Sequence, residues 1–381
     1  MQAVHARRAV AAIFFMMGTF LGVWASRIPD IKQRLDLDEA GFGLILLVMA
    51  IGAFVSFPIA GHLIDRRGAA MVTKACSFAL LAFFVLLGFG ATLWFMVPVV
   101  LMTGFFIGAL DVAMNGWGAE VEKELGRPVM SSYHGLYSLG AGVGAGAGAL
   151  AIWFGFSVPQ HFAGWGAIVG VLPILALLVP WSFEPEPKQT GGKAPLLAIP
   201  TGALLYVGLI ALVAALGEGA ITDWAALYQI TELGYETSVS AVAFSVFSAA
   251  MVVMRLLGDR IIARFGAVEV ARASGCAAVI GGLLLVSGLS VWIVWLGCAI
   301  MGLGYATLFP LAMSRAAADT TRSRGAALAA VATLGYGAFL FGPPVLGFIG
   351  DAFSLRTSFL LVAILSLLIP VLAGFMRPGR S

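Results

Sequence analysis

Long apolar segments alternate with short polar stretches along this chain. Twelve such segments can be counted, at residues 9–26, 41–61, 71–91, 95–117, 131–155, 162–182, 196–217, 238–258, 268–289, 291–313, 325–350 and 357–376. Each is close to the ~20 residues that a helix needs to cross a bilayer. None has the two-residue alternation of a membrane β-strand, and in lipid only helices and closed barrels satisfy their backbone hydrogen bonds. The pattern therefore predicts an all-α integral membrane protein with twelve transmembrane helices.

The composition agrees with this interpretation and narrows the choice of partners. Of the 381 residues, 61% are hydrophobic and only 11% are charged, and the mean hydropathy is +1.00. Soluble domains carry ~25% charged residues. The net charge of +3 is too small to favour a nucleic-acid partner, and the three cysteines are scattered through apolar segments without disulfide or metal-ligand spacing. We therefore expect a monomer surrounded by membrane lipid, with no metal site.

Lysine and arginine predict the orientation of the helices. The first apolar segment follows Arg7 and Arg8 as in a signal peptide, but its length suits an uncleaved first helix. With the N-terminus in the cytoplasm, 18 of the 22 basic residues fall on the cytoplasmic side, counting Lys74 and Arg255 at their nearest helix ends. Basic residues favour cytoplasmic loops. The outer side then holds only Arg27, Lys32, Arg34 and Arg356. Both termini are therefore expected in the cytoplasm.

The longest of these cytoplasmic loops divides the chain into two halves. Its sequence, FEPEPKQTGGKAP at 183–195, is rich in proline, glycine and charge, as linkers are. We expect a six-helix bundle at 1–183, a linker at 184–197 and a second six-helix bundle at 198–381. The chain has no G-x-x-x-x-G-K-[ST] motif, so ATP hydrolysis is not expected. We therefore expect a protein that is not an enzyme and that needs no cofactor.

A short motif recurs in the two halves. GHLIDRRG at 61–68 follows the second segment, and GDRIIARFG at 258–266 follows the eighth, with Arg66 and Arg264 198 residues apart. A repeat offset by six helices is typical of transporters whose solute site lies between two halves.

The first copy resembles the loop motif G-x-L-x-D-R-x-G of the major facilitator superfamily, through Gly61, Asp65, Arg66 and Gly68. The resemblance implies a fold of two six-helix bundles and a conformational latch at the cytoplasmic helix ends, made by these loop charges. The second copy would supply Asp259 and Arg264 to the same latch, with Ala263 where the acid of the motif belongs. Alternatively, the arginines only anchor cytoplasmic loops beside a glycine turn.

Two further stretches are similar to the fucose-permease type of sugar/proton symporter within that superfamily. They are the run from Asp111 to Asn115, and SSYHGLYSLGAGVGA, which places His134 where those proteins have an amide. The acid that they carry on helix 1 falls here on Ala25. This resemblance implies proton-coupled uptake of a small polar, sugar-like solute across a bacterial inner membrane by alternating access.

Asp111 is a carboxyl group inside a predicted span. An ionised aspartate near a helix centre costs about 2.5–3.5 kcal/mol on insertion scales, and protonation removes most of that cost. Gly104, Gly108, Asp111 and Asn115 follow helical spacing and share one face. We expect the glycines to open room there and Asp111 to be a cavity-facing proton-coupling group. The alternative is a structural acid at a helix–helix contact.

Other polar and aromatic residues are candidates for the same machinery. His134 and Glu218 are candidate proton-coupling groups, the first at the cytoplasmic start of helix 5 and the second at the outer end of helix 7. Tyr137, Trp224 and Asn115 are candidate solute contacts. Each has a structural alternative. His134 can be a packing histidine, Trp224 can belong to the aromatic belt at the membrane interface, and Glu218 can be a solvated acid at a helix end. Five more aromatic residues are candidates for stacking on a solute or for the core: Trp24, Trp117, Tyr305, Phe309 and Tyr336.

Two small-residue features concern helix packing. Gly140, Gly144 and Gly148 lie four residues apart, which favours close helix contact. Pro343 and Pro344 are expected to kink helix 11. The main functional alternatives are proton-driven efflux of an amphipathic compound, and a sensor or lipid-handling protein that transports nothing.

Overall fold

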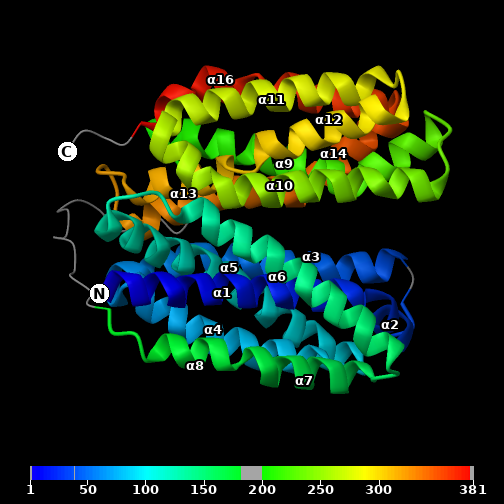
Figure 1. The fold of residues 1–381 in the computed structure, drawn as a ribbon. Coiled ribbons are helices and arrows are strands. Elements are labelled where there is room, and N and C mark those ends of the chain that lie inside the picture. The colour runs from blue at the N-terminus through cyan, green and yellow to red at the C-terminus, as the bar shows by residue number, and fades with distance from the viewer. Residues whose placement is uncertain (1, 38, 182–199, 378–381) are drawn as a thin grey trace. The chain divides into compact units, whose positions relative to one another are not determined.

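The computed structural model describes residues 2–37, 39–181 and 200–377 (Figure 1). Twelve helical stretches in this part of the chain are long and apolar enough to cross a membrane, which confirms the predicted number of spans. The predicted linker at 184–197 lies outside the described residues. The short helix α2 (Ile28–Arg34) follows the first span.

Most spans are single helices, and three are broken into consecutive pieces. The single helices are α1 (Gln2–Ser26), α3 (Glu39–Arg67), α4 (Ala69–Leu87), α5 (Leu93–Leu125), α6 (Met130–Trp153), α9 (Ala203–Thr231), α10 (Thr237–Phe265), α11 (Ala267–Ser287) and α14 (Arg324–Ala352). The broken spans are α7 (Val158–Val169) with α8 (Val171–Leu177), α12 (Val291–Tyr305) with α13 (Leu308–Ala317), and α15 (Leu355–Ser366) with α16 (Leu368–Leu372) and the 3-10 turn η1 (Ala373–Met376).

A proline accounts for each of the three breaks. Pro173, Pro310 and Pro370 lie in the second piece of their spans, and the residue four positions earlier lies at the break or within one residue of it. Proline lacks an amide hydrogen and its ring clashes with the carbonyl four residues earlier. The α-helical hydrogen bond is therefore missing where each helix is interrupted. By contrast, α14 continues through Pro343 and Pro344.

The chain forms two compact units. Each unit also contains one short segment from the other half of the sequence. Unit 1 comprises Met1–Gly126, Leu136–Ala198 and Arg322–Ala329, and unit 2 comprises Arg127–Gly135, Ile199–Thr321 and Ala330–Ser381. In unit 1, α5 packs against α1, α3 and α4. In unit 2, α12 packs against α10 and α11. The first residues of α6 thus belong to unit 2, and the first residues of α14 belong to unit 1.

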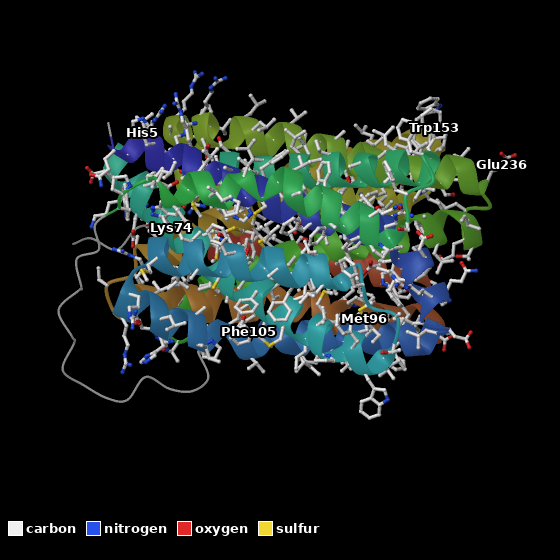
Figure 2. The ribbon with its side chains drawn as sticks, turned by 90° about the horizontal axis from the view of Figure 1, so that it is seen from below. His5, Lys74, Met96, Phe105, Trp153 and Glu236 are labelled. Carbon is white, nitrogen blue, oxygen red and sulfur yellow. The ribbon has the colours of Figure 1, made fainter. Side chains whose placement is uncertain are left out.

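Side chains mark the two ends of the helices of unit 1. Figure 2 shows His5 and Lys74 at one end and Trp153 at the opposite end. The starts of α1 and α4 therefore share an end, as expected for the first and third of a series of spans that alternate in direction. Lys74 donates a hydrogen bond from Nζ to the carbonyl oxygen of Val179 at 2.6 Å, near the end of the sixth span.

Glycines allow α1 and α6 to approach backbone to backbone in unit 1. A Cβ atom added to Gly140 would lie 2.3 Å from the carbonyl oxygen of Phe15, and one added to Gly144 would lie 2.2 Å from that of Thr19. At Gly148 the added atom would meet Ser26 Oγ at 1.9 Å. The prediction that these glycines are packing positions is therefore confirmed.

Adding one methyl group to α6 tests this packing. We expect Gly144→Ala to destabilise the protein by about 1–3 kcal/mol, because the new methyl group cannot fit against the α1 backbone. Gly142→Ala is the matched control, since nothing lies within 4 Å of a Cβ atom at that position. The melting temperatures of both variants in the same detergent measure the effect. Equal melting temperatures would contradict the described contact between α1 and α6.

Candidate functional site

Asp111 is buried inside α5, as is Asn115 one turn later. Asp111 is 3% exposed and Asn115 is 0% exposed. Asn115 Nδ2 donates to the carbonyl oxygen of Asp111 at 2.9 Å and to its Oδ1 at 3.4 Å. The amide thereby supplies one hydrogen-bond donor beside a carboxyl group that is far from either end of a 33-residue helix.

The glycines on the Asp111 face do not open room there. A Cβ atom on Gly104 would lie 1.9 Å from the carbonyl oxygen of Met49, and one on Gly108 would lie 2.4 Å from Ser56 Oγ. Both neighbours belong to α3, which packs tightly along α5. The prediction that these glycines widen a cavity is therefore wrong, because their missing side chains are the reason that α3 comes so close.

Glu218 lies in the middle of a span. The sequence pattern ended the seventh segment at residue 217 and placed Glu218 at an outer helix end, but α9 runs over Ala203–Thr231 and Glu218 is its 16th residue of 29. That placement was wrong, since the apolar pattern was interrupted by a charge that has a partner inside the protein. Glu218 Oε2 lies 3.2 Å from Arg255 Nη2.

Arg255 is a candidate site residue that the sequence pattern missed. It was counted at a helix end, but it is the 19th of the 29 residues of α10 and 6% exposed. Its Nε donates to the carbonyl oxygen of Ala306 at 3.2 Å. That carbonyl lies four residues before Pro310 and cannot receive the usual helical hydrogen bond. Arg255 lies eleven residues before Gly266, where α10 ends, and this depth inside the span was the available signal. An ionised side chain near a span centre needs such partners.

Aromatic rings extend from this ion pair within unit 2. Arg255 packs beside the start of α6, since a Cβ atom added to Gly135 would lie 3.4 Å from the Cβ atom of Arg255. The preceding residue, His134, is 7% exposed. The centroid of the His134 ring lies 5.7 Å from that of Phe309, and the Phe309 ring lies 5.9 Å from that of Tyr336. We call Arg255, His134, Phe309, Tyr336 and Glu218 the Arg255 cluster. Four of its members were predicted as separate candidates, and the fold brings them together from α6, α9, α10, α13 and α14.

Other predicted aromatic contacts have structural partners. Tyr305 is 1% exposed, and its Oη lies 2.7 Å from Ser366 Oγ. Trp24 stacks on Phe42 with 6.4 Å between the ring centroids. The fully buried Trp117 has Lys74 Nζ 5.3 Å from its ring centroid.

The remaining candidates lie at helix contacts and at a surface groove. The carbonyl oxygen of the half-buried Tyr137 would lie 2.0 Å from a Cβ atom added to Gly18. Trp224 lines a groove of about 920 Å³ in unit 2, together with Glu232, Asp351 and Arg356.

The acid of the first repeated motif binds the start of α14 within unit 1. Asp65 Oδ1 accepts a hydrogen bond from the amide of Gly325 at 2.9 Å, and its Oδ2 accepts one from Ser323 Oγ at 2.5 Å. Gly61 makes room for this contact, because a Cβ atom there would lie 2.8 Å from the carbonyl oxygen of Gly325. A carboxylate at a helix N-terminus satisfies free amides and complements the helix dipole.

The second copy makes the corresponding contact within unit 2 from a different position. Asp259 accepts hydrogen bonds from the amides of Ser131 at 2.9 Å and Ser132 at 3.0 Å, and also from the Ser132 hydroxyl group. The acid is displaced along the motif, yet it still reaches a helix start, that of α6. The turns also match, since Gly68 and Gly266 have φ angles of 84° and 82°.

The arginines of the two motifs do not take part in these contacts. Arg66 is exposed, and Arg264 lies over the ring of the adjacent Phe265, 5.2 Å from its centroid. We call these two contacts the Asp65 cap and the Asp259 cap. They are made by the acids and the glycines of the motifs.

Each cap can be tested through the helix start that it holds. We expect Asp65→Ala to speed amide hydrogen exchange about fivefold in the first turn of α14, and Asp259→Ala to do so in the first turn of α6, since losing such a cap costs about 1 kcal/mol. Exchange measured by mass spectrometry would show whether each effect is confined to its own helix. Arg264→Ala is the control and should change neither; unchanged exchange in the aspartate variants would rule out the caps.

Comparison with known proteins agrees with this architecture. The family model of the Major Facilitator Superfamily matches residues 9–336. Over 370 residues the chain is 40% identical to the uncharacterized transporter y4wD of Sinorhizobium fredii, covering 97% of this chain and 98% of that protein. An uncharacterized transporter of Yersinia pestis is 32% identical over 359 residues, and this match covers 93% of this chain and 91% of that protein.

Among solved structures, the fold matches FucP, crystallised in the outward conformation. The TM-score is 0.80 at 18% sequence identity, and the match covers 99% of this chain and 100% of that chain. The model match and the two relatives together extend over nearly the whole sequence. The chain is therefore a multi-pass membrane protein that belongs to the Major Facilitator Superfamily, a family of transporters and not of enzymes.

Proposed function

We propose that this protein is a proton-coupled secondary active transporter that moves a small polar, sugar-like solute across the bacterial inner membrane by alternating access. One observation carries the proposal: each unit places a carboxyl group in the interior of a helix that is long enough to span the membrane. These groups are Asp111 on α5, 3% exposed, and Glu218 on α9, whose side chain is 31% exposed.

Carboxyl groups in such places are suited to carry protons. Their ionised form costs about 2.5–3.5 kcal/mol at a span centre unless water or a cation compensates it, whereas the neutral form avoids most of that cost. Each charge that moves through 100 mV provides about 2.3 kcal/mol. A protein whose buried carboxyl groups bind and release protons in different conformations can use this energy to concentrate a solute.

Similarity to symporters supports the direction of transport. The solved structure of FucP from E. coli, described as a fucose:proton symporter, matches this fold with a TM-score of 0.77 at 17% identity. Uptake is therefore the favoured direction over efflux of an amphipathic compound.

The proposed orientation, with both termini in the cytoplasm, rests on the distribution of basic residues. Arg255 no longer counts toward that distribution, because it lies inside a span.

The Asp65 and Asp259 caps fit a conformational cycle of this kind. Each holds the start of one helix through two or more hydrogen bonds from a neighbouring turn. We propose that these contacts form in one conformation of the transport cycle and open in another, as the latch of the superfamily does.

Flux in proteoliposomes tests the function. We expect purified protein, reconstituted with an internal pH dye, to acidify the lumen when one member of a panel of sugars and sugar derivatives is added outside. We expect Asp111→Asn to lose at least tenfold of uphill solute accumulation, because the side chain can no longer exchange a proton, while keeping exchange of labelled for unlabelled solute. Glu269→Gln, an exposed acid in the first turn of α11, is the control.

One outcome would remove Asp111 from the mechanism, and another would contradict transport itself. If the Asp111→Asn variant accumulates solute uphill as well as the parent does, Asp111 has no part in coupling. If no compound moves under an imposed pH gradient, while a protein partner co-purifies, the protein is a sensor and not a carrier.

A further inference from the structure

The pairing of Arg255 with Glu218 carries an inference about the solute, which rests on the proposed transport function. We propose that Arg255 binds the carboxylate group of the solute, that the solute is a small hydroxylated carboxylic acid of the sugar-acid type, and that Glu218 leaves Arg255 and takes up a proton when this anion binds. Neutral sugars would lack the group that Arg255 recognises.

The two partners of the ion pair are held unequally. The Arg255 side chain is 7% exposed and is fixed from behind by the Ala306 carbonyl oxygen, whereas the Glu218 side chain is 31% exposed. Since Glu218 lies on the more open side of the pair, it is the partner that can move away. Arg255 would then remain in place, with a direction open for a new anion.

A solute carboxylate can compete with Glu218 for the guanidinium group. Glu218 Oε2 lies 3.2 Å from Arg255 Nη2. A carboxylate that is free to approach a guanidinium group can bind it through two parallel hydrogen bonds, which is the geometry that arginine favours.

The rest of the Arg255 cluster suits the uncharged part of such a solute. Phe309 and Tyr336 are half-buried and present aromatic rings, and His134 adds a ring with hydrogen-bonding nitrogens. Small-molecule sites commonly combine aromatic walls with a few fixed polar groups. Aromatic rings can cover the carbon–hydrogen face of a sugar acid, while the hydroxyl groups of the sugar acid form hydrogen bonds to the polar atoms of the cluster.

Charge balance links binding of the anion to uptake of a proton. Without solute, the site holds Arg255 as a cation and Glu218 as an anion. If a solute carboxylate replaces Glu218, the freed glutamate is left inside a span without its cation, and an unpaired ion there is costly. Binding one proton from water to the Glu218 carboxylate removes that cost. The site then gains one anion and one proton, so its net charge is unchanged.

Several other titratable groups of unit 2 have contacts of their own, and Asp223 lies further along α9 as an exposed acid. On α10, Asp259 binds the start of α6, and on α12, Tyr305 bonds to Ser366. On α13, Arg315 pairs with Asp319 at 3.4 Å. His134 and Tyr336 remain as groups of the cluster itself, and histidine is the side-chain type whose ordinary pKa lies nearest neutral pH. A test of pH dependence therefore has to separate Glu218 from His134.

Binding measurements on the purified full-length protein test the inference. The probes are D-galacturonate and D-gluconate, with D-galactose as the neutral control, followed by thermal shift and calorimetry between about pH 5.5 and 8.5. We expect the acids to bind and galactose not to bind. Affinity should fall up to tenfold for each pH unit in the range where Glu218 must gain a proton, because binding then takes up one proton.

Two conservative variants identify the group that takes the proton. Glu218→Gln should bind the acids without this pH dependence and at least tenfold more tightly at pH 8.5, since the competing carboxylate is gone. His134→Gln should keep the pH dependence. Arg255→Lys should lose at least tenfold in affinity; if this variant does not fold, the other two still decide.

Several results would overturn the inference. Binding of galactose as tight as that of galacturonate, or no binding of either acid, would exclude a sugar acid. An unchanged pH dependence in Glu218→Gln would exclude Glu218 as the proton acceptor. If galactose drives proton flux in proteoliposomes and the acids do not, the proposed transport function stands and only the solute class is wrong. If neither class moves but both acids bind as described, the transport function fails instead.

Discussion

The absence of water inside a bilayer is the constraint on which this structure depends. Every backbone amide, carbonyl and charged side chain within a span has to find its partner in the protein. The helices satisfy most backbone groups by themselves. What remains is a small set of exceptions at proline breaks, at helix starts and at buried charges, and these exceptions lie where the candidate functional contacts are found.

In each unit, backbone groups that lack a helical partner are paired with polar side chains. Pro310 leaves the Ala306 carbonyl without its helical donor, and Arg255 supplies one. The first amides of α6 and α14 lack helical acceptors, and Asp259 and Asp65 supply them. Asp111 has an amide from Asn115 beside it. Arg255, Asp259 and Asp65 thus each supply a partner to a backbone group that its own helix leaves unsatisfied.

The sequence predicts the number of spans, because hydrophobic length is a property of each segment alone. It also predicts the glycine contacts of α6, since a four-residue spacing marks a helix face. The end of the seventh span was misplaced because Glu218 interrupts its apolar run, and only the fold shows that Arg255 compensates this charge. Gly104 and Gly108 were misinterpreted for a related reason: a missing side chain can be a space or a contact, and the neighbouring helix decides which. Asp259 reaches a helix start despite its displaced position, which motif spacing does not reveal.

The broken helix formed by α12 and α13 has a consequence beyond its geometry. A continuous helix transmits strain along an unbroken ladder of hydrogen bonds, whereas an interrupted one can yield at the interruption. Arg255 is fastened to that weak point through the Ala306 carbonyl oxygen. A displacement of the guanidinium group would therefore act on the neighbouring span at the place where its ladder of helical hydrogen bonds is interrupted.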